Sequence, residues 1–355
     1  MKSKTFINEV FFIRAIATLS VVLVHSITVT VNSYQLPALT VDIFRGIQMT
    51  LMFATPTFIL ISEILAAYSY PEKTPKGFLW KRFKFIFVPY MVIGTIYALY
   101  HFTTVPFSMD AFLEEWISIV LKGQWHGYFV LIIFQFYILH FLFARYLSKV
   151  SGTIILPITF VINGVYLGYF NFVDPVGATQ FYIWYDVSRI PFLAWIFYFS
   201  LAYYVGKNLT TFKYYLNRFK WIILVGAVGL AGFVVYSYHT GFINMIWSNR
   251  VDVMVYTVFM MFALFYLGSR FKKIPKFITL ISKFSFGIYL LHPLFHKIFV
   301  RTSHELPYIN MGIYLLIALL LGVFGSMLVT FLLNKIRFGK YVVGKTGVTP
   351  KKEAA

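Results

Sequence analysis

The ionisable side chains of Arg14 and His25 lie in an apolar stretch at residues 9–31 that is long enough to cross a bilayer. Eleven helical residues make roughly three turns, so both side chains are expected on one face, about 16 Å apart along the axis. A neutral imidazole can accept a hydroxyl proton or carry an acyl group, and a guanidinium can hold phosphate. The alternative is that Arg14 snorkels to the headgroups and His25 is a hydrogen-bonded packing residue.

More charged side chains are expected at the level of Arg14. Glu63 lies near the cytoplasmic end of the second apolar run, where a carboxylate needs a partner or a proton, and Arg14 is the expected partner. The third run opens with WKRFKFIFVPY, which brings Lys81, Arg82 and Lys84 to the same surface. A bias of basic residues toward the cytoplasm explains these three, but such a cluster also suits a phosphate-rich cytosolic donor.

A second histidine is expected at the depth of His25. His292 lies in SKFSFGIYLLHPLFHKIF, about as far along its run as His25 is along the first run, and both runs cross in the same direction. Pro293 would leave backbone carbonyls free beside it, which suits a helix that lines a cavity. The alternative is a pair of unrelated packing histidines. No role is assigned to the histidines at span ends or in loops, which are His101, His140, His239, His296 and His304.

Aromatic and polar side chains also gather where the fourth run begins, in LKGQWHGYFV. Trp125, His126 and Tyr128 are expected at the outer interface. An aromatic belt at the headgroups explains Trp125 and Tyr128. The same residues would also suit stacking on sugar rings, so they are candidate sugar-binding residues.

Composition places these residues in an integral membrane protein. Of 355 residues, 59% are hydrophobic and 12% charged, against about 25% charged in soluble domains, and the mean hydropathy is +0.76. No cysteine is present, which excludes disulfides, a thiolate nucleophile and cysteine-ligated metal. The histidines and acidic residues are scattered over different runs, so no metal site is predicted. The first run is too long for a signal peptide and is expected to stay as a span.

The hydropathy pattern predicts an all-α bundle of about ten transmembrane helices. The expected runs are 9–31, 43–68, 82–102, 128–147, 152–170, 190–206, 218–238, 251–268, 278–300 and 311–334. The loops are too short for a soluble catalytic domain. Residues 1–340 are therefore expected to form a single membrane domain, and the polar segment 341–355 a disordered cytoplasmic tail.

The formal charge of +19 does not indicate a nucleic-acid partner, because most Lys and Arg fall in alternate loops. This positive-inside pattern predicts that both termini are cytoplasmic and that the protein is a multi-pass protein of the plasma membrane, in contact with its lipids. The other loops carry more acidic than basic residues.

Four of these segments, in this order, resemble the acyltransferase-3 family of membrane acyltransferases. FFIRAIATLSVVLVH is similar to the family's first helix, and TFILISEIL to its pattern FFxxSGFL, with Glu63 where glycine is usual. RFKFIFVPY resembles an RxxR-then-Pro pattern in which only Arg82 matches and Phe85 replaces the second Arg. SFGIYLLHPLF resembles the SYxxYLxHP signature. LKGQWHGYFVLIIFQFYIL and WIFYFSLAYYVG look closest to the intercellular-adhesin branch, which acts on poly-N-acetylglucosamine.

The resemblance implies an O-acyltransferase that moves acetyl or succinyl from cytoplasmic acyl-CoA to hydroxyls of a cell-surface polysaccharide. It implies catalytic roles for His25 and Arg14, donor binding by Arg14, Arg82, Lys84 and Glu63, and acceptor binding by Trp125, His126, Tyr128 and His292. Export of the same polysaccharide is the alternative function, because the branch has also been viewed as an exporter. A membrane scaffold that partners a glycan synthase is a third alternative.

Overall fold

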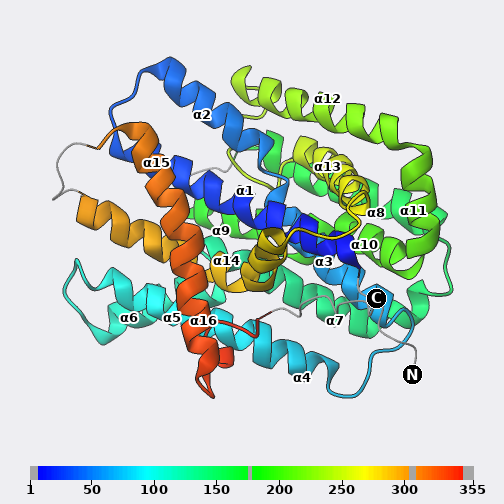
Figure 1. Cartoon of the computed structure of the whole chain (residues 1–355), viewed down its shortest axis with the longest axis horizontal. Coiled ribbons are helices and arrows are strands. Elements are labelled where there is room, and N and C mark those ends of the chain that lie inside the picture. Colours follow the sequence, from blue (N-terminus) through cyan, green and yellow to red (C-terminus); the bar gives the residue numbers. More distant parts are fainter. Residues whose placement is uncertain (1–6, 175–177, 304–308, 347–355) are drawn as a thin grey trace.

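The computed structural model describes residues 7–174, 178–303 and 309–346, and within these ranges the regular secondary structure is helical (Figure 1). Nine helices or joined helices in the described chain are long and apolar enough to cross a membrane. They are α1 (Asn8–Ser33), α2 and α3 (Ala38–Ser69), α4 to α5 (Phe78–His101), α7 with its preceding turn (His126–Leu147), α8 (Gly152–Phe172), α12 (Lys220–His239), α13 (Val251–Ser269), α14 (Lys276–Ser303), and α15 to α16 (Met311–Lys335). The protein is therefore an all-α integral membrane bundle.

The expected span at 190–206 is shorter than predicted. Pro191 precedes a 3₁₀ turn, Phe192–Trp195, and only Ile196–Lys207 forms the following helix, α10. Twelve residues reach about 18 Å, less than the roughly 30 Å hydrocarbon core. Protein surrounds α10, since residues 198–206 are all buried and the helix packs against α3 and α8. An apolar run enclosed by protein does not need the full bilayer length, which is why ten runs yield nine long helices.

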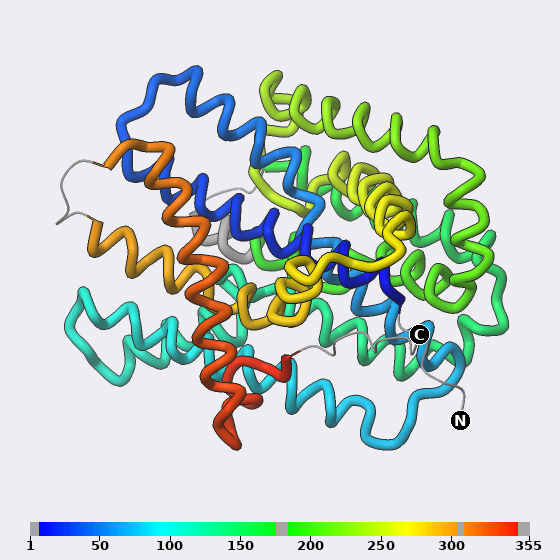
Figure 2. Tube along the Cα trace, in the orientation of Figure 1, coloured from blue at the N-terminus to red at the C-terminus, as the bar shows by residue number. Residues whose placement is uncertain are grey.

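Helix α1, which carries Arg14 and His25, lies inside the bundle. It packs against α14, α13, α3 and α15, and Figure 2 shows it passing through the middle of the molecule. Small residues on its neighbours allow the close approach: a Cβ added at Gly268 of α13 would lie 3.3 Å from the Cα of Glu9, and one at Gly322 would lie 2.8 Å from Val22. The side chains of α1 therefore meet other helices on several sides.

The second span is broken at Leu51–Phe53, between α2 (Ala38–Thr50) and α3 (Ala54–Ser69). The Gln48 amide anchors the end of α2 by donating to the Val24 carbonyl at 2.9 Å and to the Thr28 hydroxyl at 2.8 Å. Pro56 fits the first turn of α3, where a missing N–H breaks no helical bond. Irregular backbone at membrane depth is tolerated where it lines a cavity.

The remaining elements are short and connect the spans. They are α6 (Met109–Trp116), the π-helix Ile117–Leu121, α9 (Ala178–Arg189), α11 (Leu209–Arg218) and the 3₁₀ turn Gly339–Tyr341. Both α6 and the π-helix pack against α5, and the Trp116 indole donates to the Thr95 hydroxyl at 2.9 Å. Ile119 and Val120 are buried.

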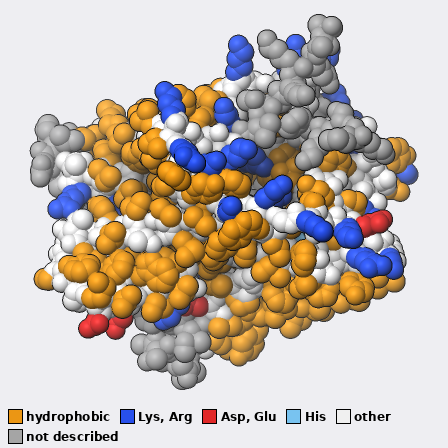
Figure 3. Space-filling view, turned by 90° about the horizontal axis from the view of Figure 1, so that it is seen from below, with side chains coloured by type: hydrophobic (Ala, Val, Ile, Leu, Met, Phe, Trp, Pro, Cys, Tyr) orange, Lys and Arg blue, Asp and Glu red, His pale blue; other side chains and the backbone are white. Residues whose placement is uncertain are grey.

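The surface has the distribution expected of a membrane protein. Wide hydrophobic areas cover the face in Figure 3, and Lys and Arg gather mainly toward its upper and right-hand parts. The packed chain extends beyond the predicted boundary at residue 340: Val343 is buried, and the Tyr341 ring stacks on Phe85. Residues 347–355 of the predicted tail lie outside the described residues. The cytoplasmic location of both termini remains a prediction.

Candidate active site

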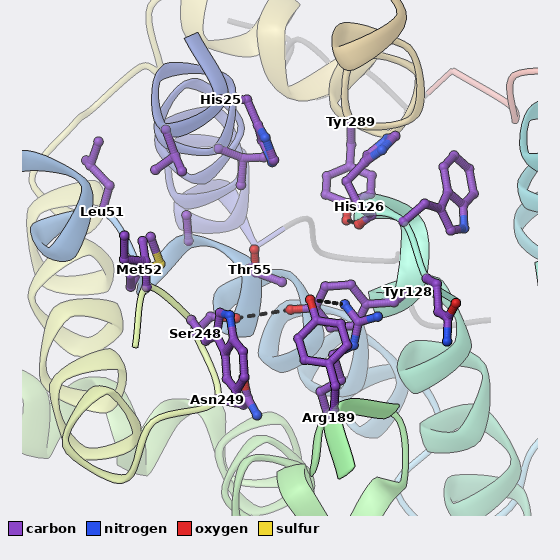
Figure 4. Close-up of a pocket in the computed structure, with 18 residues that line it drawn as sticks. His25, Leu51, Met52, Thr55, His126, Tyr128, Arg189, Ser248, Asn249 and Tyr289 are labelled. Carbon is purple, nitrogen blue, oxygen red and sulfur yellow. Dashed lines mark hydrogen bonds between the residues drawn. The ribbon is translucent and has the colours of Figure 1, made fainter. Parts of the chain in front are cut away.

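A cavity of about 370 Å³ lies beside His25 (Figure 4). Its walls come from α1, the break between α2 and α3, residues 124–128, the end of α9, the segment before α13, and α14. His25 reaches into it from α1, while His126 and Tyr289 line the facing side. Ser248 and Asn249 lie toward another wall with Arg189 and Tyr128. Aromatic rings and hydrogen-bonding groups thus surround the His25 imidazole.

Three imidazoles from distant parts of the chain meet at this cavity wall. The ring centroid of His25 lies 5.1 Å from that of His292 and 6.3 Å from that of His126, and His126 lies 5.4 Å from His292. The equal depth expected for His25 and His292 is confirmed by this contact. His25 is partly exposed to the cavity, whereas His292 is fully buried and is not a lining residue. Among the described residues, no group of His and acidic residues could hold a metal ion.

Backbone carbonyls fix the tautomers of two of these rings. A carbonyl only accepts, so His292 donates Nδ1–H to the Ile288 carbonyl at 2.9 Å, and His126 donates Nε2–H to the Leu290 carbonyl at 3.3 Å. His296 is tied in the same way through Nε2, to the Ala318 carbonyl at 3.1 Å. Each of these rings therefore keeps its other nitrogen as an acceptor when neutral.

The segment that carries Trp125 and His126 owes its shape to two glycines. Gly123 has φ +66°, a conformation that favours glycine, and a Cβ at Gly127 would lie 2.3 Å from the Trp125 ring. The Trp125 indole packs against Tyr97, with ring centroids 5.0 Å apart. The Tyr289 hydroxyl donates to the His126 carbonyl. The predicted acceptor residues therefore sit on a rigid turn at the cavity.

Arg189, to which the sequence analysis gave no role, lines the cavity opposite His25. Its guanidinium carbon lies 3.7 Å from the Tyr185 ring centroid and 4.7 Å from that of Tyr128. Nη1 donates to the Tyr185 hydroxyl at 2.8 Å, and Asp186 lies 3.6 Å from Nη2. The Tyr128 hydroxyl hydrogen-bonds to the Ser248 hydroxyl at 3.2 Å. A sequence signal existed in the run WYDVSRIP, where Arg189 follows aromatic and acidic residues just before a proline.

A buried ion pair holds the cavity wall formed by residues 246–249. Arg250 is fully buried and donates to Asp252 through Nε at 3.0 Å and Nη2 at 2.5 Å. Its Nη1 donates to the Met245 carbonyl at 2.9 Å. The Asn249 amide donates to the Ser188 carbonyl at 3.3 Å, which joins this wall to the end of α9. Two predicted loops are thereby fixed to each other at the cavity.

A second polar cluster lies on α3 and α7, and it corrects the expected partner of Glu63. The Glu63 carboxylate pairs with Nδ1 of His140 at 2.6 Å, and both side chains are fully buried. His140 Nε2 donates to the Tyr70 carbonyl at 3.0 Å. The predicted Glu63–Arg14 pair is wrong because α7 packs against α3 and delivers His140 to the carboxylate. His140 had been placed at a span end; it lies within α7.

The predicted basic donor residues differ in their surroundings. Arg82 lies over the Phe78 and Tyr137 rings, 5.0 Å from each centroid, and its Nε has no hydrogen-bond partner among the described residues. Arg14 is partly buried on α1 and forms no ion pair within 4 Å among the described residues. Lys84 instead contacts the Trp80 ring at 4.9 Å. Arg82 and Lys84 thus contact different aromatic rings.

Comparison with known proteins identifies the family of this chain. The model of the acyltransferase domain family Acyl_transf_3 matches residues 7–335. The chain belongs to this family. It is 41% identical over 346 residues to a Bacillus subtilis protein named "Putative membrane-bound acyltransferase YfiQ", covering 96% of this chain and 94% of the relative.

More distant relatives carry a different name. A Staphylococcus aureus protein named "Probable poly-beta-1,6-N-acetyl-D-glucosamine export protein" is 28% identical over 340 residues, covering 94% of this chain and 95% of that protein. A Staphylococcus epidermidis protein of the same name is 28% identical over 343 residues, covering 94% of each chain. No solved structure matches the chain. The protein is therefore a multi-pass membrane protein of an acyltransferase family, with relatives named for both catalysis and export.

The two predicted catalytic residues are separated along α1. Arg14 and His25 are expected about 16 Å apart on this helix. His25, Trp125, His126 and Tyr128 line the described cavity, and Arg14 and Arg82 are not among its lining residues.

Proposed function

We propose that this protein is an O-acyltransferase that moves an acyl group, acetyl or succinyl, from cytoplasmic acyl-CoA to a hydroxyl of a cell-surface polysaccharide such as poly-N-acetylglucosamine. The observation that carries the proposal is the placement of His25. Its ring is partly exposed in a cavity lined by aromatic and hydrogen-bonding side chains, and the chain belongs to an acyltransferase family. Such a lining suits a sugar ring, with few polar groups to orient it.

In the proposed reaction, neutral His25 accepts the proton of the acceptor hydroxyl. The hydroxyl oxygen attacks the thioester carbonyl of the donor, the carbon–sulfur bond breaks, and an ester forms. The leaving CoA thiolate takes up the proton from His25, so no net proton is gained or lost. Trp125, His126 and Tyr128 hold the acceptor in this scheme, and all three line the cavity.

Arg14 and Arg82 are the proposed donor-binding residues. Arg82 lies over the Tyr137 ring, and neither Arg14 nor Arg82 forms an ion pair within 4 Å in the part of the chain that the structure describes. A guanidinium without an ion-pair partner can bind phosphate oxygens in a bidentate manner. The long pantetheine arm of acyl-CoA would carry the thioester from this region toward His25. Glu63, which pairs with His140, and Lys84, which contacts the Trp80 ring, are the other two proposed donor-binding residues.

Polysaccharide export is the second candidate function. Two observations favour it: the staphylococcal relatives are named as export proteins, and the second span is broken beside the cavity, as in many transporters. An exporter would pass polymer through the cavity without needing a base, so the two functions differ in their dependence on His25.

The deciding experiment uses the full-length protein in proteoliposomes. Radiolabelled acetyl-CoA or succinyl-CoA is supplied on one side and poly-β-1,6-N-acetylglucosamine oligosaccharides on the other, and ester formation is followed by mass spectrometry. His25→Ala should lower the transfer rate by about 10²–10⁴-fold, because it removes the general base. His101→Ala, at an exposed position in α5, is the matched control and should retain the wild-type rate.

Transfer at the wild-type rate by His25→Ala would reject the catalytic assignment. Export is measured in parallel, as polymer reaching the surface of cells that carry each variant. Loss of acylation with normal surface polymer supports the enzyme. Surface polymer that requires the wild-type protein and is unchanged in His25→Ala, with no acyl transfer by either protein, would support the exporter.

A further inference from the structure

His292 adjoins His25 but does not line the cavity. It is fully buried and is not a lining residue, yet its ring centroid is 5.1 Å from that of His25. Helix α14 packs along α1 over much of its length, so this contact belongs to an extensive interface. Because His292 does not reach the cavity, contact with a substrate does not explain why an imidazole is buried beside the proposed base.

The hydrogen bonds of His292 leave one nitrogen without a partner. Because Nδ1–H donates to the Ile288 carbonyl at 2.9 Å, the neutral ring must carry its lone pair on Nε2. That Nε2 is buried and has no hydrogen-bond partner within the described ranges. Buried polar atoms are nearly always paired, and an exception commonly marks a functional site. The neighbouring ring able to supply an N–H is that of His25, whose nitrogens have no hydrogen-bond partner within the described ranges.

We propose that His292 is a positioning residue for His25. Its Nε2 accepts the N–H of His25, so that the other nitrogen of His25 faces the cavity unprotonated. Two hydrogen-bonded nitrogens lie about 2.9 Å apart, and each lies about 1 Å from its ring centre, so the two centroids would be about 5 Å apart. The observed separation of 5.1 Å therefore matches this bond after a small ring rotation. The arrangement follows the logic of hydrolase triads, in which a third group holds the catalytic imidazole in one tautomer. The inference rests on the proposed role of His25 as the base.

The N–H groups of the other nearby imidazoles are already engaged by backbone carbonyls. His126 is farther from His25, at 6.3 Å between centroids, and its Nε2–H is held by the Leu290 carbonyl. His296, whose centroid lies 5.7 Å from that of His292, binds the Ala318 carbonyl and the Ser26 hydroxyl through Nε2. His292 is therefore the imidazole whose free acceptor lies closest to His25.

The test measures the reactivity of His25 without any substrate. Purified full-length protein in detergent is treated with diethyl pyrocarbonate, which acylates neutral imidazole nitrogen, and the modification rate of the His25 peptide is followed by mass spectrometry. His292→Phe keeps a buried ring but offers no acceptor, whereas His292→Gln places an amide oxygen near the position of Nε2. We expect the Phe variant to lose about tenfold in rate and the Gln variant to recover most of it, because orientation of the nitrogen is lost and then restored. His101→Phe is the remote control.

Equal His25 reactivity in wild type, Phe and Gln variants would overturn the proposal. Equal losses of His25 reactivity in the Phe and Gln variants would also overturn it. In that case the amide oxygen of Gln would restore nothing, and the role of His292 would be purely structural. If the Phe variant does not fold, His292→Leu provides a second substitution without an acceptor. Acyl transfer is measured on the same samples, and kcat should follow the reactivity while KM for acyl-CoA stays constant. Absence of transfer in the wild type would reject the proposed function and leave the reactivity test intact.

Discussion

The Glu63–His140 pair shows how a single residue depends on partners far away in sequence. The carboxylate was expected to need a partner, and it has one. The identity of this partner was not predictable, because the depth of a residue along its helix does not tell which faces of two helices meet. His140 and Arg14 both lie at accessible depths, and only the packing of α7 on α3 decides between them. The similar depth of His25 and His292 was predictable because both histidines lie equally far along parallel runs, but the contact between their rings was not.

A double-mutant cycle tests this pair. Glu63→Ala and His140→Ala should each lower the free energy of unfolding by about 3–5 kcal/mol, because one buried polar partner is left alone. The double variant should cost clearly less than the sum of the two, because neither group is then stranded. Thermal or denaturant unfolding in detergent gives the values. Glu72→Ala, at an exposed position, should change stability by no more than about 0.5 kcal/mol. Simple additivity of the two losses would contradict the coupling.

At the scale of helices, the departures from prediction are the break in the second span and the shortness of α10. Hydropathy counts apolar residues and does not register whether lipid or protein surrounds them, so a buried twelve-residue helix and a full span look alike. The break at Leu51–Phe53 has a sequence signal only in Pro56, three residues later. Both departures lie beside polar clusters: the break lines the cavity, and α10 packs on the helix that carries Glu63.

Close packing of α10 on α3 should make Gly206 intolerant of a side chain. A Cβ at this position would lie 2.5 Å from the Ile64 carbonyl oxygen, which is backbone and cannot move aside. Gly206→Ala should therefore lower the free energy of unfolding by about 1–3 kcal/mol. Gly168→Ala in α8 is the matched control, because no atom lies within 4 Å of its added Cβ. The control should be neutral or stabilising by about 0.5–1 kcal/mol. Equal melting temperatures for the two variants would contradict the packing argument.

At the scale of the whole molecule, three segments far apart in sequence converge on one cavity. Residues 124–128, 185–189 and 246–249 were all predicted on the outer side, and all line the space beside His25. Charge bias can assign such loops to one side of the membrane, but it cannot show that they meet. Their meeting depends on contacts such as the Asn249–Ser188 hydrogen bond, for which the sequence carries no periodic signal.

The proposal of a cell-surface acceptor depends on the orientation of the protein in the membrane. This orientation can be tested directly with introduced cysteines, because the chain contains none of its own. Lys122 and Lys273 are exposed and lie in loops predicted on opposite sides of the membrane. With both termini cytoplasmic, Lys122→Cys should react with an impermeant maleimide in intact cells, and Lys273→Cys should react only after lysis. The cysteine-free wild type is the blank, and total labelling after lysis corrects for expression. The reverse pattern would turn the loops that line the cavity toward the cytosol. His25 would then lie on the same side as acyl-CoA, and a cell-surface polysaccharide could no longer be the acceptor.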